Sequence, residues 1–294
     1  MLQEIRTDLA LERLDLAKQS HGMGRGVDGV TYKRKTICGI GVHTMEIHTE
    51  SAANILCKPI GMYYTISLKK LLKRCDDSFI DGAKCIAEIL RSVLPETNRY
   101  LIACLGNPRI TPDALGPQCA QHLMVTRHLK AYMPETFSDF SEVSLVSPGV
   151  LGTTGIESAS LVKGAVDAVQ PDAVIVVDAL AAGSMDRLCC TIQICDTGIE
   201  PGSGVGNRRF ALNKETLGVP VISIGVPTVV DVATILNNVE GMEDSQKQGK
   251  TDQMMVTPRE IDSYISDSAK LIAYGVNFAL HDGLTLEDID LFIS

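Results

Sequence analysis

Two aspartates far apart in the chain occupy positions that suit a catalytic carboxylate pair. Asp178 directly follows the apolar run 173–177, and Asp113 follows the apolar run 100–105 across a loop that holds one glycine and two prolines. Two neighbouring carboxyl groups do not both ionise easily, so one of them keeps its proton. The ionised member can activate a water molecule while the protonated member polarises a peptide carbonyl. This residue pair therefore suits hydrolysis of a peptide bond.

Each aspartate also has an ordinary structural interpretation. Asp113 could cap a helix, and Asp178 could be a hydrogen-bonding residue at a strand end. Two further residues, Asn107 in the loop before Asp113 and Asp196 after the run 191–195, are candidates for lining the same cleft. Asp196 opens an Asp-Thr-Gly tripeptide typical of pepsin-like enzymes, but those are all-β proteins that use it twice or in a small dimerising chain. A single copy in an α/β pattern argues against that role.

The segments that must position these residues alternate between strand and helix patterns. Apolar, often β-branched runs predict strands at 100–105, 143–146, 173–177, 191–195 and 219–224, and helical spacing predicts helices at 113–130, 155–170, 229–239 and 260–281. This alternation predicts an α/β fold with a central, mostly parallel sheet and helices on both faces. Ligands of such sheets bind beyond the carboxyl ends of the strands, where Asp113 and Asp178 are expected.

Additional pieces flank this alternating region. The N-terminal part is expected to be β-rich, with strands at 35–49 and 62–68 and a helix at 77–94, and the C-terminal piece is expected to be helical. Residues 1–20 form either a short amphipathic helix or an extended arm. Polar, aperiodic residues at 241–257 predict a linker.

Composition limits the classes of protein that fit. The 294 residues are 45% hydrophobic and 21% charged, which is typical of a globular protein with a sizeable core. A formal net charge of -9 disfavours binding to nucleic acid and would attract a basic protein substrate. Nine cysteines, no signal-peptide pattern and no apolar run of membrane-spanning length predict a reduced, cytoplasmic compartment without membrane insertion.

Longer stretches of the chain resemble the germination protease family of spore-forming bacteria. The match is collinear through residues 1–17 and about 100–240, and looser through 20–99 and 241–294. The matching segments are RTDLA (6–10), LGNPRITPDALGP (105–117), VTRHL (125–129), SPGVLGTTGIE (147–157), PDAVIVVDALA (171–181), TIQICDTGIEPGSGVGNRR (191–209) and KETLGVPVISIGVPTVVD (214–231).

The resemblance implies an endopeptidase that starts the degradation of small acid-soluble, DNA-coating spore proteins during germination, inside the spore core. It also implies a fold related to hydrogenase-maturation peptidases, a homotetramer and no cofactor. The family's two proposed catalytic aspartates correspond to Asp113 and Asp178, the pair already selected by position in the predicted sheet.

The resemblance further implies a zymogen that processes itself. The family cuts after an acidic residue and before a hydrophobic residue followed by alanine, and Asp8-Leu9-Ala10 has that form. We therefore expect self-cleavage between Asp8 and Leu9, which would separate a propeptide, 1–8, from a single peptidase domain, 9–294. The alternative is an ordinary N-terminal arm. A carboxyl pair that shares one proton is expected to favour processing under mildly acidic conditions.

Two alternatives to an aspartate peptidase remain. In the hydrogenase-maturation relatives two acidic residues and a histidine hold a metal; no matching histidine is found, but Asp113 and Asp178 would be the natural ligands of a divalent cation in a metallopeptidase. The family usually has an arginine shortly after Asp-Ala-Leu-Ala, where this chain has Ala182-Gly183-Ser184, so either substrate positioning is altered or Arg187 supplies the charge. The same departure leaves open an inactive relative that binds spore proteins.

Overall fold

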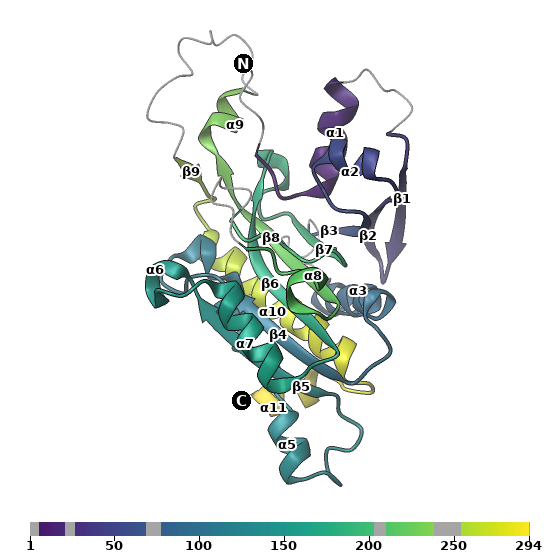
Figure 1. Cartoon of the computed structure of the whole chain (residues 1–294), viewed down its shortest axis with the longest axis vertical. Coiled ribbons are helices and arrows are strands. Elements are labelled where there is room, and N and C mark those ends of the chain that lie inside the picture. The colour runs from purple at the N-terminus through teal and green to yellow at the C-terminus, as the bar shows by residue number, and fades with distance from the viewer. Residues whose placement is uncertain (1–5, 21–26, 69–77, 203–209, 238–253, 294) are drawn as a thin grey trace.

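A nine-stranded mixed sheet forms the centre of the molecule (Figure 1). The structure, a computed structural model, describes residues 6–20, 27–68, 78–202, 210–237 and 254–293. The strand order is β1-β2-β3-β7-β8-β6-β4-β5, and β9 pairs with β8. The strands are β1 (Val30–Ile37), β2 (Ile40–Ile47), β3 (Gly61–Ser67), β4 (Arg99–Leu105), β5 (Glu142–Gly149), β6 (Ala173–Ala182), β7 (Thr191–Cys195), β8 (Val221–Asp231) and β9 (Met255–Val256).

Four adjacent strands, β5, β4, β6 and β8, are parallel, as the βαβ alternation predicts. The remaining pairings are antiparallel, because β7 runs against β8 and is continued by β3, β2 and β1. The predicted α/β class, with its additional N-terminal strands and C-terminal helices, is confirmed. Because the four strands β5, β4, β6 and β8 are parallel, the carboxyl ends of β4 and β5 lie at the same end of the sheet.

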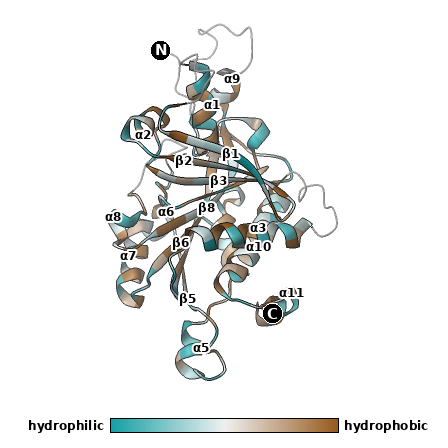
Figure 2. Cartoon of the chain, turned by 90° about the vertical axis from the view of Figure 1, so that its right-hand side faces the viewer, coloured by the Kyte–Doolittle hydropathy of each residue, from teal (hydrophilic) through white to brown (hydrophobic). Residues whose placement is uncertain are grey.

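Helices cover both faces of this sheet. On one face α3 (Ser78–Val93), α4 (Leu115–Ala120) and α10 (Ile261–Leu280) enclose the largest apolar core, with α11 (Leu286–Ile293) beside them. On the other face α7 (Ser158–Val169) and α8 (Lys214–Leu217) pack on the parallel strands, and α1 (Ala10–Ser20) and α2 (Glu50–Leu56) pack on the antiparallel ones. Figure 1 shows α7 in front of the sheet and the yellow α10 behind it, and Figure 2 shows apolar colour concentrated in the strands between these layers.

The helices predicted after β4 and β8 are wrong in part. The range 113–130 divides into a 3-10 turn, η2 (Thr111–Asp113), then α4 and then α5 (Arg127–Tyr132). Pro117 lies in the first turn of α4, and Gly116 lets this helix approach β4: a Cβ at Gly116 would lie 2.1 Å from the Leu105 carbonyl oxygen. The range 229–239 begins as strand, because β8 continues to Asp231 before α9 (Val232–Asn237) starts.

A second difference concerns the range 35–49, which was expected to be one strand. It forms most of the β1–β2 hairpin, whose turn places Cys38 at φ 46° and Gly39 at φ 75°. Glycine adopts such a left-handed conformation readily, but cysteine does so rarely. Because strand-like residues stand on both sides of Cys38 and Gly39, the sequence was interpreted as one continuous strand.

The N-terminus combines the two alternatives expected for it. Residues 6–9 form an extended arm, and α1 begins at Ala10. Leu9, Ala10 and Leu14 are almost completely buried, so arm and helix are packed into the protein. None of the helices in the described residues has the length and hydrophobicity that crossing a bilayer would need. The linker expected at 241–257 lies mostly outside the described residues; its last residues include β9.

Candidate active site

A cavity of about 580 Å³ lies beyond the carboxyl ends of β4 and β5 and along the last residues of β6. Asp113, Asp178 and Asn107, three residues predicted from the sequence, line this cavity together, and Asp8 of the N-terminal arm lines it as well. The remaining walls come from the segment after β5, from the ends of β6 and β8, and from the segment at β9. The carboxyl end of a parallel sheet is the usual place for such a site.

Asp178 lies inside β6, not after it, because the strand predicted to end at residue 177 continues to Ala182. Its neighbours Val174 and Val176 belong to the core under α7, so the alternation of a strand places Asp178 on that same face. The side chain is 6% exposed, and its Oδ1 accepts a hydrogen bond from the Ala179 N–H at 2.9 Å. Burial raises the pKa of Asp178 well above its ordinary value, and the charge of Asp113 raises it further.

Asp113 is the last residue of η2, at the exit from the loop after β4. The Asn107 N–H donates to Asp113 Oδ2 and to the Asp113 carbonyl oxygen, both at 3.0 Å. Burial raises the pKa of Asp113 to about 6, although the hydrogen bond from Asn107 opposes the shift. The loop needs Gly106, which has φ 117° and whose added Cβ would lie 2.0 Å from the Asp113 carbonyl oxygen.

Both carboxyl groups keep their protons to higher pH than an ordinary aspartate. Burial raises the pKa of Asp113 to about 6, and burial together with the charge of Asp113 raises the pKa of Asp178 well above its ordinary value. Two such neighbouring groups can share one proton, so that one is ionised while the other stays protonated. One carboxylate can accept a proton from water while one carboxylic acid donates a hydrogen bond to a carbonyl.

Asp196 lies away from this cavity. It follows β7, which is antiparallel to β8 and therefore ends toward the opposite end of the sheet. Its Oδ1 accepts a hydrogen bond from the Met62 N–H at 2.8 Å, so the carboxylate fixes the start of β3. The sequence shows that a strand precedes Asp196 but not in which direction that strand runs.

The arm residue Asp8, predicted to precede the cleaved bond, is held by main-chain atoms of β6. The Asp8 N–H donates to the Ala181 carbonyl oxygen at 3.0 Å, and the Ala181 N–H donates to Asp8 Oδ2 at 2.9 Å. Leu9 is completely buried. The side chain of Gln193, in β7, contacts the arm on both sides of Leu9, a role that no motif in the sequence indicated.

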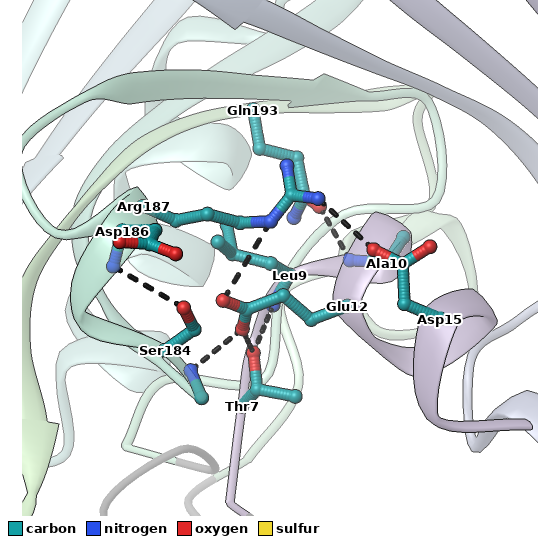
Figure 3. Close-up of polar contacts among 10 residues, drawn as sticks. Thr7, Leu9, Ala10, Glu12, Asp15, Ser184, Asp186, Arg187 and Gln193 are labelled. Atoms are coloured by element: carbon teal, nitrogen blue, oxygen red, sulfur yellow. Dashed lines mark hydrogen bonds and ion pairs between the residues drawn. The ribbon is translucent and has the colours of Figure 1, made fainter. Parts of the chain in front are cut away.

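Arg187 does not replace the family's missing arginine at this cavity. Its guanidinium lies 3.0 Å from Asp15 Oδ2, and its Nε lies 3.8 Å from Glu12 Oε1 (Figure 3). Glu12 is buried; its Oε2 accepts hydrogen bonds from the Thr7 hydroxyl and from the Gly183 N–H. Burial raises the pKa of Glu12. Arg187 and the segment after β6 therefore fasten α1 and the arm in place.

The cavity residues do not fit a metal centre of the kind found in hydrogenase-maturation peptidases. The carboxylates that line it are Asp8, Asp113 and Asp178, and none of its lining residues is a histidine. Across the described ranges, no group of three or more histidine, cysteine, aspartate or glutamate side chains is arranged to hold a metal ion.

Comparison with known proteins finds relatives that match almost the whole chain. The family model described as germination protease matches residues 9–241 and 248–293. A germination protease from Clostridium perfringens is 39% identical over 100% of both chains, and one from Caldanaerobacter subterraneus subsp. tengcongensis is 42% identical over 97% of both. Among solved structures, a NiFe hydrogenase maturation protease HycI from Thermococcus kodakarensis matches 64% of this chain and 98% of its own at 21% identity, with a TM-score of 0.36. The chain therefore belongs to the germination protease family.

Proposed function

We propose that this member of a peptidase family is an aspartate-dependent endopeptidase that uses Asp113 and Asp178. The observation that carries this proposal is one cavity lined by two carboxyl groups, both with raised pKa values. Around neutral pH, ionised Asp113 takes a proton from a water molecule, and protonated Asp178 hydrogen-bonds to the carbonyl oxygen of the peptide bond. The water oxygen then attacks the carbonyl carbon, and a carboxyl proton passes to the leaving nitrogen as the C–N bond breaks.

We further propose that the chain is a zymogen that cuts its own Asp8–Leu9 bond. Asp8 lines the same cavity as the two catalytic candidates, and its charge raises the pKa of Asp178, so the arm and the pair are in electrostatic contact. An extended peptide is the conformation that proteases bind, because it exposes both edges of its backbone. Residues 6–9 have this extended form before α1 begins.

The physiological substrates proposed from family membership are small acid-soluble spore proteins in the spore core, and the proposed assembly is a homotetramer. The net charge of -9 supports a basic, DNA-coating substrate, because opposite charges favour encounter. It does not support direct binding to nucleic acid.

Replacement of each aspartate by asparagine tests the mechanism. Asp113→Asn and Asp178→Asn are each expected to lower the rate of loss of residues 1–8, and of cleavage of a small spore protein, by at least about 100-fold. Asp196→Asn is the matched control, since Asp196 is also a partly buried carboxylate but lies outside the cavity; it is expected to retain wild-type turnover.

Three outcomes separate the competing mechanisms. Wild-type turnover in both active-site variants would exclude the aspartate pair. Loss of wild-type activity on exhaustive chelation, with recovery on adding a divalent cation, would instead support a metallopeptidase that uses the same carboxylates. An inactive, spore-protein-binding relative would make no specific cut in any peptide with an acidic residue before Leu-Ala.

A further inference from the structure

The last five residues of β6 leave one edge of the sheet open beside the aspartate pair. β4 pairs with β6 only as far as Cys104 and Val177, whereas β8 pairs with β6 up to Ala182. On the β4 side, no described strand pairs with residues 178–182. A strand edge of this kind presents unpaired N–H and carbonyl groups that bind an extended peptide. Asp8 fills part of this edge through its two hydrogen bonds to Ala181.

The side chain of Gln193, in β7, holds the same peptide. Its Nε2 donates to the Asp8 carbonyl oxygen at 3.1 Å. Its Oε1 accepts from the Ala10 N–H at 2.7 Å (Figure 3). The carbonyl belongs to the Asp8–Leu9 peptide bond, and the N–H belongs to the next peptide bond. One side-chain amide therefore hydrogen-bonds to the backbone on both sides of Leu9, as the backbone of a neighbouring strand would.

The sheet places Gln193 in line with one of the aspartates. Asp178 in β6 is opposite Gly225 in β8, and Gly225 is opposite Gln193 in β7. Residues opposite one another in adjacent strands point to the same face, so Asp178 and Gln193 flank a position that has no side chain. A Cβ at Gly225 would lie 2.6 Å from Leu180 Cγ and 2.9 Å from the Asp178 carbonyl oxygen, so this position has no room for a larger residue.

We propose that Gln193 is a positioning residue that, together with the β6 edge at Ala181, selects Asp8–Leu9 as the bond to be cut. This proposal rests on the proposed function, because it concerns the same reaction at the same peptide bond. Gln193 is 6% exposed, and both hydrogen bonds that its side-chain amide makes with described residues go to atoms of the arm. A buried amide that loses such partners has a large desolvation cost, so the arm is held firmly in one register. The Ala181 N–H adds selectivity for an acidic residue at position 8.

Substitutions at Gln193 in the full-length chain test this role. Gln193→Met keeps the length of the side chain but removes both hydrogen bonds, and Gln193→Glu keeps an acceptor for the Ala10 N–H but loses the donor to Asp8. Gln121→Met, at an exposed glutamine, is the matched control. The measurements are the rate of processing and the position of the cut, both from intact mass, with the thermal unfolding midpoint as a check on folding.

We expect Gln193→Met to slow loss of residues 1–8 by at least about tenfold and to spread the cut over neighbouring bonds. Gln193→Glu is expected to be slowed but to cut only after Asp8, a rescue of register that a purely structural role would not give. Gln121→Met should behave as wild type.

The results separate this proposal from the one on which it rests. A folded Gln193→Met protein that cuts only at Asp8–Leu9 and at the wild-type rate overturns the positioning role, even if Asp178→Asn is inactive. If Gln193→Met does not fold, wild-type processing by Gln193→Glu overturns it instead. A wild-type chain that never loses residues 1–8 overturns both the self-processing and the role of Gln193.

Discussion

At the scale of single residues, Asp113 and Asp178 are costly to the folded protein. Burial makes a carboxyl group resist ionisation, and both groups have raised pKa values chiefly for this reason. Natural proteins keep such groups where their chemistry is needed, often at the expense of stability. Each of the two aspartates is therefore expected to increase the activity of the protein and to decrease its stability.

The activity of this pair should depend on pH in a defined direction. Asp113 must be ionised, so self-processing should fall as the pH drops below about 6, the pKa to which burial raises this group. Asp178 must keep its proton, so processing should also fall in alkaline solution as its raised pKa is passed. Initial rates of loss of residues 1–8 across the pH range measure this profile. A rate that keeps increasing toward alkaline pH would contradict the shared-proton mechanism.

The stability effect has the opposite sign. The pKa of Asp113 is higher in the folded state, about 6 against 3.8, so the stability associated with its protonated form is present below pH 4 and lost as the pH rises to about 6. Asparagine does not titrate. Asp113→Asn should therefore raise the free energy of unfolding at pH 7 by roughly 1–3 kcal/mol, after allowance for solvent around a partly exposed group.

Denaturant unfolding at pH 7 and at pH 3.5 measures this difference. The gain should be present at the higher pH and absent at the lower one. An Asp113→Asn protein that is less stable than wild type at pH 7 would show that the ionised carboxylate supports the fold.

The sequence identified the two aspartates and Asn107 but not all the residues around them. Position after an apolar run was enough to select Asp113 and Asp178, because parallel strands bring their carboxyl ends together. Gln193 was missed, since its contact with the arm depends on which strands are neighbours. Asp196 was placed near the cleft in error for the same reason: its strand is antiparallel.

At the scale of elements, the length of β6 decides where the cavity forms. The β-branched run 173–177 predicted its first half, but Ala179-Leu180-Ala181-Ala182 has the composition of a helix. Pairing with β8, through a register shift after Leu180, keeps this segment extended. Tertiary contacts that outweigh local propensity cannot be inferred from the segment alone.

The other element boundaries follow the same rule. The strand β4 and the long helix α10 were predicted closely, because their apolar patterns are regular, whereas β5, β6 and β8 extend beyond their predicted ends. The range 113–130 was predicted as one helix, although η2, α4 and α5 occupy it, since each short element keeps helical spacing. The turn at Cys38 and Gly39 has no residue pattern that distinguishes it from a strand.

The loop between β4 and η2 should be sensitive to one methyl group. Gly106→Ala forces a non-glycine residue into φ 117° and places Cβ 2.0 Å from the Asp113 carbonyl oxygen. We expect a loss of about 2–4 kcal/mol in the free energy of unfolding and slower processing, because the loop that holds Asp113 must shift. Thermal or denaturant unfolding, with the processing rate, tests this.

Gly152→Ala is the matched control for that substitution. Gly152 lines the same cavity, but an added Cβ has no heavy atom within 4 Å. Its stability and processing should stay close to wild type. Equal effects of the two substitutions would show that crowding at Gly106 does not determine the position of Asp113.

At the scale of the whole molecule, the N-terminal arm and α1 connect regions that the strand order keeps apart. Asp8 contacts Ala181 near the end of β6, and Glu12 of α1 accepts a hydrogen bond from the Gly183 N–H just after this strand. In addition, α1 packs on β2 and β3, and Arg187 pairs with Asp15 on α1 (Figure 3). These contacts form only when the whole sheet is assembled. The position of the arm could not be predicted from its own sequence, which fits a helix or an extended chain equally well.

The complete burial of Leu9 has a consequence for reaction order. A bond held inside its own molecule meets the cutting groups without any encounter in solution, so maturation should be unimolecular. The half-life of the uncut chain should stay constant over a hundredfold dilution, measured by mass at each dilution. Mixing in an inactive Asp178→Asn chain, which keeps the Asp8–Leu9 bond, should leave that chain intact while its wild-type neighbours mature. A half-life that lengthens in proportion to dilution would mean that one copy matures another.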